Sequence, residues 1–127
     1  AERPAPLDAA ALRAAVDRYF EALDALDVDA VVAQFAPGGS LLCVTDGRAP
    51  RGHAELRAFF EVVCGGSRGM EHPVRWAAVD VAARRVAVHV HYRDEREGGA
   101  VYDEQTCNLF ELDEQGRLLR VLFWRGR

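Results

Sequence analysis

Apolar residues near the start of the chain recur every three or four positions, the period of a helix with one buried face. The repeat begins after Asp8, a residue type that caps helices well, and continues to Leu26. The pattern predicts a helix over residues 8–26. Its buried stripe consists of Leu12, Val16, Tyr19, Leu23 and Leu26.

A second, shorter helix and a strand are expected next. Asp27 or Asp29 caps the helix, which we expect to run through Phe35. After a Gly-Gly turn, the alternation of residues 40–46 predicts a strand. One face of that strand carries Leu41, Cys43 and Thr45.

The helical period returns once more and then gives way to a period of two. A third helix is predicted over 53–63, and the glycines at 65 and 66 end it. From residue 71 onward the alternation is typical of strands in an antiparallel meander. The four predicted strands are Glu71–Val81 (through Val74, Trp76 and Ala78), Arg85–Asp94, Ala100–Leu112 and Arg117–Trp124.

The order of these elements indicates the α+β class, with helices on one face of a curved sheet. We expect a single domain over residues 8–127, preceded by a flexible Pro/Ala-rich lead over residues 1–7. The lead lacks the regions of a signal peptide, and the apolar runs are too short to span a bilayer.

Composition narrows the possible partners. The formal charge is −4, and sixteen basic residues, all arginine, are spread among twenty acids. Nucleic acid is not expected as a partner because it requires a basic stripe. Three cysteines without CxxC spacing argue against a structural disulfide or zinc site, and favour the reducing cytoplasm.

The element order and several short motifs resemble the nuclear transport factor 2-like superfamily, and within it ketosteroid isomerases and SnoaL-like polyketide cyclases. The resemblance covers residues 8–125. It implies an α+β, cone-shaped, curved antiparallel or mixed β-sheet wrapped around three N-terminal helices (a cystatin-like roll) with a pocket inside. The motifs are Arg18-Tyr19-Phe20 with Ala22-Leu23, Val31 with Phe35-Ala36, Arg51-Gly52-His53 with Phe59-Phe60, and Phe110, Gly116 and Leu122-Phe123.

The resemblance assigns three positions of the isomerase site. The oxyanion-hole tyrosine falls on Tyr19 and the general-base aspartate falls on Cys43. The protonated aspartate that shares the oxyanion in those enzymes falls on Asn108. A tyrosine hydroxyl and an amide N–H can together hold an oxyanion. The alternatives are a core tyrosine, an asparagine that bonds its own neighbours, and a cysteine that only fills space.

The missing base leaves several candidates for proton transfer. Glu104 shares a strand face with Tyr102, Thr106 and Asn108, and can serve as base or solvate the rim. Asp46, His53 and His72 are further candidates. His89 and His91 lie opposite an apolar strand face, so we expect them to point outward without binding metal. Arg125 either holds an anionic substrate or pairs with an acid.

The leading hypothesis is a cofactor-free isomerase, cyclase or dehydratase of secondary metabolism, without metal. It would polarise the carbonyl or phenolic oxygen of a small hydrophobic, aromatic or polycyclic ligand. Homodimerisation through the sheet is implied by the resemblance. The alternative is a non-catalytic ligand-binding or accessory protein, and a third is a pure dimerisation module. The pocket is expected to be lined by Phe35, Leu41, Phe60, Val88, Val90, Tyr92, Phe110, Val121, Phe123 and Arg125.

Overall fold

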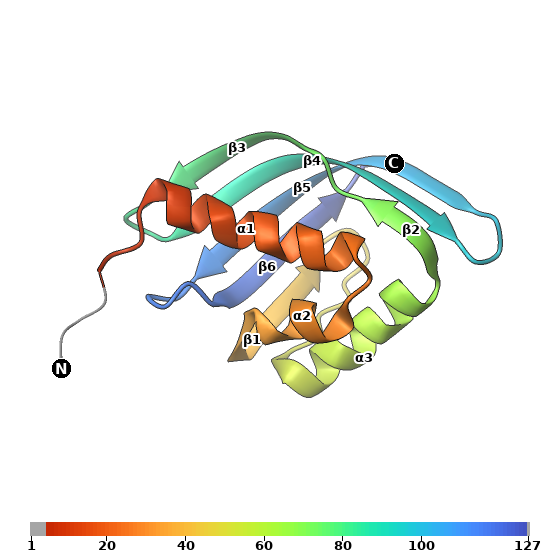
Figure 1. Ribbon diagram of the computed structural model, residues 1–127, viewed down its shortest axis with the longest axis horizontal. Helices are drawn as coiled ribbons and strands as arrows, with labels where there is room; N and C mark the ends of the chain where they lie inside the picture. Colours follow the sequence, from red (N-terminus) through yellow and green to blue (C-terminus); the bar gives the residue numbers. More distant parts are fainter. Residues whose placement is uncertain (1–4, 127) are drawn as a thin grey trace.

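A computed structural model describes residues 5–126 of the chain. Within them, three helices pack on the concave face of one six-stranded sheet. Figure 1 shows α1 lying across the curved sheet, with α2 and α3 beside the edge formed by β1. The elements are α1 (Ala9–Asp24), α2 (Val28–Ala33), β1 (Phe35–Cys43), α3 (Gly52–Gly65), β2 (Ser67–Glu71), β3 (Val74–Asp80), β4 (Arg85–Arg96), β5 (Val101–Leu112) and β6 (Leu118–Arg125).

The sheet is mixed, as the family resemblance implied. Its order is β1-β6-β5-β4-β2, and β3 pairs with the other half of β4. All pairs are antiparallel except β1 with β6, which is parallel. The predicted α+β class and the curved sheet around three helices are confirmed.

The first helix forms as its sequence pattern predicts. Asp8 is the N-cap, and its carboxylate accepts a hydrogen bond from the backbone N–H of Ala11 at 2.8 Å. Leu12, Val16 and Tyr19 are buried on one face, against the alternating valines of β4. Because a fully buried apolar side chain of this size contributes about 1.5–3 kcal/mol, this face fixes the helix on the sheet.

The predicted boundaries around β1 need two corrections. Phe35 begins β1 instead of ending α2, because it pairs with Leu118 of β6, whose N–H donates to the carbonyl of Gln34 at 2.8 Å. The strand ends at Cys43, not at Asp46, because a turn starts there and the N–H of Gly47 donates to the Cys43 carbonyl.

The predicted meander is also wrong in its first strand. The expected strand over residues 71–81 corresponds to β3, which starts only after Pro73, a residue with no N–H to donate to a ladder. The strand before it, β2, was not predicted. The sheet therefore has six strands. The sequence predicted five, which were the short strand over residues 40–46 and the four strands of the meander. A register shift after Val74 turns Trp76 outward, and its side chain is 54% exposed.

Other expectations concern the surface and the start of the chain. Residues 1–4 of the predicted flexible lead lie outside the described residues, and Leu7 packs against the core.

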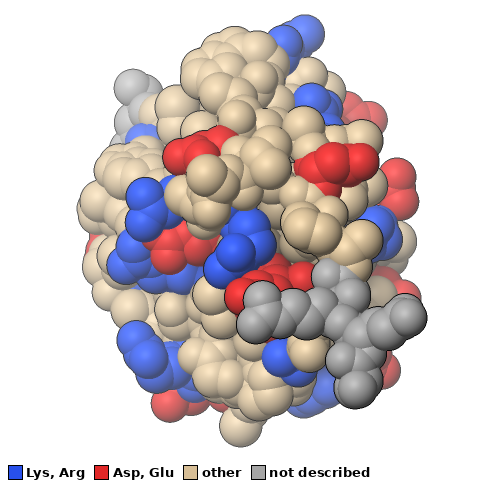
Figure 2. All heavy atoms as spheres, turned by 90° about the vertical axis from the view of Figure 1, so that its left-hand side faces the viewer, with Lys and Arg blue, Asp and Glu red and all other residues tan. Residues whose placement is uncertain are grey.

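Figure 2 shows acidic and basic side chains interspersed on one face of the molecule. In the described part of the chain, no helix has the length and apolarity needed to cross a membrane.

Candidate functional site

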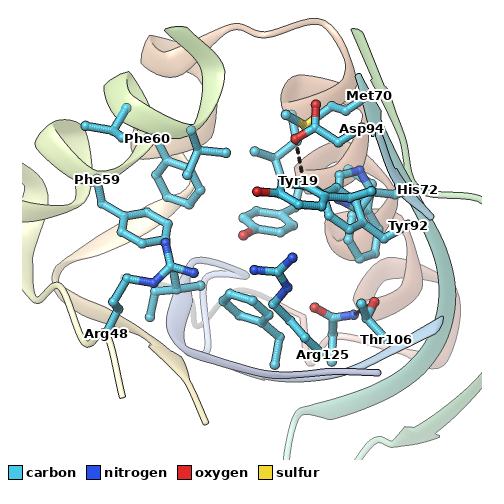
Figure 3. Close-up of a pocket in the computed structure, with 18 of the residues that line it drawn as sticks. Tyr19, Arg48, Phe59, Phe60, Met70, His72, Tyr92, Asp94, Thr106 and Arg125 are labelled. Carbon is cyan, nitrogen blue, oxygen red and sulfur yellow. Dashed lines mark hydrogen bonds between the residues drawn. The ribbon is translucent and has the colours of Figure 1, made fainter. Parts of the chain in front are cut away.

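A cavity of about 210 Å³ lies between α1, α3 and the concave face of the sheet (Figure 3). Its exposed lining residues, Arg48, Val62 and Tyr102, mark its mouth. A dry cavity of about 150 Å³ is enough for a benzene ring, so this one has room for a small bicyclic molecule. Arginine, aspartate, asparagine and tyrosine interrupt its apolar wall. The lining residues are Tyr19, Phe20, Leu23, Leu41, Arg48, Phe59, Phe60, Val62, Val63, Met70, His72, Tyr92, Asp94, Arg96, Tyr102, Thr106, Asn108, Phe123 and Arg125.

Tyr19 is held in this cavity by aromatic packing alone. Its side chain is 4% exposed. Its ring makes edge contacts with four phenylalanines, at centroid distances of 5.4–6.4 Å. Its hydroxyl makes no hydrogen bond to residues 5–126, and burial raises its pKa well above the ordinary value. The hydroxyl therefore keeps its proton at neutral pH and is a donor without a protein acceptor.

Asn108 and Thr106 form a polar patch on the β5 wall of the same cavity. Both side chains are buried, and the Nδ2 of Asn108 donates to the Oγ1 of Thr106 at 3.2 Å. This bond uses one of the two amide N–H groups. The second N–H makes no hydrogen bond to residues 5–126 and is available to a bound molecule.

His72 and Asp24 form a pair at the wall of the cavity nearest the end of α1. The carboxylate of Asp24 lies 2.6 Å from the Nδ1 of His72. The imidazole is stacked between the rings of Phe20 and Tyr92, each with a centroid distance of 5.0 Å. When the imidazole is neutral, a carboxylate at Nδ1 places the ring proton there and leaves the lone pair on Nε2. This is the arrangement of an oriented general base.

Glu104 and Arg125 form an ion pair at the mouth of the cavity. Arg125 Nη2 donates to Glu104 Oε2 at 2.5 Å, and the two side chains are 18% and 11% exposed. The guanidinium also lies over the ring of Tyr102. Glu104 itself does not line the cavity. Of the two predicted roles for Arg125, pairing with an acid is confirmed, and Figure 3 shows its side chain extending toward the centre of the cavity.

A second buried ion pair lies deeper, where β4 meets β2. Asp94 is 0% exposed and accepts hydrogen bonds from Ser67 Oγ at 2.6 Å, Tyr92 Oη at 2.5 Å and Arg96 Nη1 at 2.8 Å. Arg96 Nη1 also donates to the carbonyl of Val63. Burial, together with the bond to Asp94, raises the pKa of Tyr92. The sequence pattern did not predict this network.

Arg48 completes the mouth from the loop after β1. Its Nε and Nη2 approach the same carboxylate oxygen of Asp46 at 2.8 and 2.7 Å. Its guanidinium lies 5.2 Å from the ring centroid of Phe59. The hydrogen bonds from the Arg48 side chain and backbone lower the pKa of Asp46 well below its ordinary range. Asp46 is thus a bound partner of Arg48 outside the cavity lining, and not a base within it.

Apart from Glu104, which is paired with Arg125 outside the lining, the predicted site residues fall into two groups. Tyr19, Asn108, Leu41, Phe60, Tyr92, Phe123 and Arg125 line the cavity. The others are packed behind its wall, where α1 and α3 cover the sheet. These are Cys43, Phe35, Val88, Val90, Phe110 and Val121, all at most 1% exposed.

The remaining histidines lie away from the cavity. His53 Nε2 contacts the carbonyl of Phe35 at 2.8 Å and ties the start of α3 to β1. His89 and His91 point outward as predicted, next to Gln105 and Asp103 on β5. Among residues 5–126, no group of three or more histidine, cysteine, aspartate or glutamate side chains is placed to hold a metal ion.

Comparison with known proteins gives a family match and a fold match. Residues 16–121 match the family described as SnoaL-like domain. No curated protein matches the chain.

Many solved structures share the fold. One is SalBIII, an epoxide hydrolase/cyclase-like enzyme with a role in pyran ring formation in polyether salinomycin. It has a TM-score of 0.83 and 18% sequence identity, and the alignment covers 94% of this chain and 93% of SalBIII. BvnE pinacolase from Penicillium brevicompactum has a TM-score of 0.82, 20% identity, and coverage of 91% and 86%. A putative SnoaL-like polyketide cyclase from Shewanella denitrificans OS-217 has a TM-score of 0.80, 14% identity, and coverage of 90% and 89%. Identities this low show a shared fold alone.

Proposed function

The chain belongs to the SnoaL-like domain family, and we propose that it is a cofactor-free isomerase, cyclase or dehydratase of secondary metabolism acting on a small aromatic or polycyclic ligand. In this proposal the cavity polarises a carbonyl or phenolic oxygen between Tyr19 and Asn108, and His72 moves the proton. One observation carries the proposal. A donor hydroxyl, a donor amide and an imidazole oriented by an aspartate all line one cavity, which is large enough for a bicyclic molecule.

Each residue has a role that follows from its surroundings. His72 Nε2 accepts a proton from the carbon next to the carbonyl. The C–H electron pair becomes the new C=C bond, and the carbonyl pair moves onto oxygen. Tyr19 and Asn108 donate to that oxyanion, and a donor of this kind is worth about 2.7–4 kcal/mol of barrier. The proton then returns to another carbon, or to a leaving oxygen.

His72 replaces Glu104 as the preferred base in this proposal. Glu104 is bound to Arg125 and lies outside the cavity lining. Cys43 is buried away from the cavity as well. Asp24, which contacts His72, acts as a positioning residue because it sets the tautomer of the imidazole.

The minimal chemistry can be tested without knowing the substrate. 2-Tetralone is a bicyclic ketone, and exchange of its α-hydrogens in D₂O, followed by NMR, reports enolisation. We expect the protein to accelerate exchange, Tyr19→Phe and Asn108→Ala each to slow it at least tenfold, and His72→Gln to slow it by about 10²–10⁴-fold.

The matched control is Tyr102→Phe, which removes a hydroxyl from the exposed mouth and should change the exchange rate less than twofold. Circular dichroism would confirm that each variant is folded. A rate equal to that of buffer, or a rate indifferent to both Tyr19 and His72, would contradict the proposal.

A non-catalytic ligand-binding or accessory protein is the second candidate. The observation that favours it is the position of the isomerase base, where Cys43 is buried behind the wall and no carboxylate replaces it. This candidate predicts tight binding of bicyclic ligands with no acceleration of exchange, so the same experiment separates the two functions.

Homodimerisation through the outer face of the sheet is part of the proposal. Trp76, His89, Cys107 and Trp124 are directly paired in one row across β3, β4, β5 and β6. Paired residues share a face, and both tryptophans are exposed. Analytical ultracentrifugation should give the dimer mass for the wild type and the monomer mass for Trp124→Glu. A monomeric wild type would contradict it.

A reducing cytoplasm is the proposed location. Cys43, Cys64 and Cys107 are all free thiols in the structure. Thiol titration of protein purified without added reductant should therefore give three reactive groups after unfolding, and fewer than three would contradict this location.

A further inference from the structure

We propose that the cavity takes a substrate with a carboxylate at the end opposite its reacting oxygen, and that Arg48 and Arg125 bind this carboxylate at the mouth. The inference rests on the proposed function, because it uses Tyr19 and Asn108 to orient the molecule. It adds a substrate class, an anionic bicyclic acid, and a residue, Arg48, that the sequence did not suggest.

The charge of the cavity wall is the first observation. Three arginines line it, against one aspartate, in a chain whose net charge is −4. Arg96 is committed to Asp94 and to the carbonyl of Val63. Arg48 and Arg125 are the other two, and their acid partners lie outside the lining. At the mouth the arginine end of each ion pair, and not its acid end, therefore faces the cavity.

The pairing of Arg125 is incomplete. A guanidinium and a carboxylate can form two parallel hydrogen bonds, which satisfy four atoms at once. Here only Nη2 and Oε2 are in contact, and Arg125 Nε and Glu104 Oε1 are buried without a partner. Nη1 makes no hydrogen bond to residues 5–126. A buried polar atom without a partner costs about 1–3 kcal/mol, so the site retains unused donor capacity at a measurable cost in stability.

Arg48 is bound on one side only. Its Nε and Nη2 face Asp46, while Nη1 makes no hydrogen bond to the described residues. The ring of Phe59 lies against the guanidinium and limits its movement. A guanidinium has five N–H donors and no acceptor. Each mouth arginine thus has an unused amino group for an oxygen of a ligand.

Backbone pairing places the two arginines at the same end of the sheet. The carbonyl of Arg48 accepts from the N–H of Cys43, and Cys43 is paired with Phe123 of β6. Arg125 is the next residue on the Phe123 face, and its own N–H donates to Thr45 Oγ1 at 2.8 Å. The two backbones are therefore separated by two strand spacings, about 10 Å, across the sheet and by two residues, about 7 Å, along it, which is about 12 Å in all. Long side chains from both positions can meet at one carboxylate.

The depth of the cavity sets the length of the ligand. Arg125 is paired with Thr106, and Asn108 lies two residues further along β5. Two residues of a strand span about 7 Å. A molecule with its carboxylate at Arg125 and its reacting oxygen at Asn108 is therefore about two fused rings long, which agrees with the cavity volume.

Two isosteric probes test this inference. 6-Hydroxy-2-naphthoic acid carries a carboxylate opposite its phenol, and 6-hydroxy-2-naphthamide is its neutral counterpart. Fluorescence titrations at low salt should show the acid binding at least tenfold more tightly than the amide, a difference of about 1.4 kcal/mol. Added salt should reduce the preference, because the mouth is open to solvent.

Three variants locate the preference. Arg48→Gln should lower it at least threefold, and Arg125→Gln combined with Glu104→Gln, which avoids an unpaired buried carboxylate, should do the same. Arg120→Gln is the matched control, since Arg120 is on the same strand, pairs with Glu111 at 2.8 Å and does not line the cavity. It should leave the preference unchanged.

The outcomes separate this inference from the proposed function. Equal binding of acid and amide, with binding of the amide still weakened by Tyr19→Phe, would overturn the carboxylate inference and leave the proposed function standing. A preference that persists when Arg48, Glu104 and Arg125 are all replaced by glutamine would also overturn it. Failure of both probes to bind would contradict both proposals.

Discussion

Two buried ion pairs lie on the same sheet and differ in how completely they are satisfied. The Asp94–Arg96 pair is closed, because the fully buried carboxylate accepts from three side chains. The Glu104–Arg125 pair is open, because a single contact joins it and one atom on each side is buried without a partner. Both pairs are beside the cavity, so distance from the site does not explain the difference.

The difference indicates what each pair is for. A closed network rigidifies its surroundings, and Asp94 ties β2, β4 and the end of α3 together through Ser67 and Arg96. An open pair contributes less to stability and keeps hydrogen-bonding capacity for a ligand. A carboxylate–arginine pair thus supports the wall in one place and recognition in the other.

The largest expected effect is on the closed pair. Asp94→Asn keeps the size of the side chain but leaves the partly buried Arg96 without a charged partner. We expect the free energy of unfolding, measured by denaturant titration, to fall by about 3–5 kcal/mol. A loss below about 1 kcal/mol would mean that the network does not support the wall.

The packing around Arg96 gives a second test. A Cβ added at Gly66 would overlap the Arg96 guanidinium, whereas one added at Gly69 would meet no atom within 4 Å. Gly66→Ala should therefore lower the free energy of unfolding by about 1–3 kcal/mol, and Gly69→Ala should not lower it. Equal effects of the two substitutions would show that Arg96 is free to move.

Glu104→Gln should lower the free energy of unfolding less than Asp94→Asn does in the closed pair. The amide oxygen can still accept from Arg125, and one oxygen of Glu104 is unpaired already. We expect a loss of about 1 kcal/mol in the free energy of unfolding. If Glu104→Gln and Asp94→Asn prove equally costly, the contrast between an open and a closed pair fails.

Breaking the exposed Arg48–Asp46 pair at the mouth should have the smallest effect on the free energy of unfolding. The pKa of Asp46 is lowered in the folded state, so its contribution to stability is present above about pH 4 and is lost as the pH falls below that. Arg48→Gln should cost at most about 1 kcal/mol at pH 7, and NMR titration should show the pKa of Asp46 rising toward its ordinary value. An unchanged pKa would show that Arg48 does not hold the carboxylate.

The sequence predicted the fold far better than it predicted the site. Helix periodicity and the Asp8 cap located α1, and alternation located β4 and β5, because these signals are local. Residue Phe35 and strand β2 were misjudged, because their state depends on pairing with β6 and β4. Local pattern cannot report such partners.

The polar contacts of the site were mostly beyond sequence reasoning. Continuing the alternation of β4 past Tyr92 would have placed Asp94 on the inner face. Its bond to Ser67, and the bond of His72 to Asp24, join residues far apart in the chain. The pairing of β2 with β4 brings the first two together, and the packing of α1 against β2 and β3 brings Asp24 to His72.

The most direct test of the central claim is the ionisation state of bound 2-naphthol, read from its absorption and fluorescence spectra as the pH is varied. If Tyr19 and Asn108 hold an oxyanion, the bound phenol should ionise below the ordinary phenolic pKa of about 10, and Tyr19→Phe and Asn108→Ala should each raise that value. A bound phenol that ionises above its pKa in water, and is indifferent to both substitutions, would contradict the account.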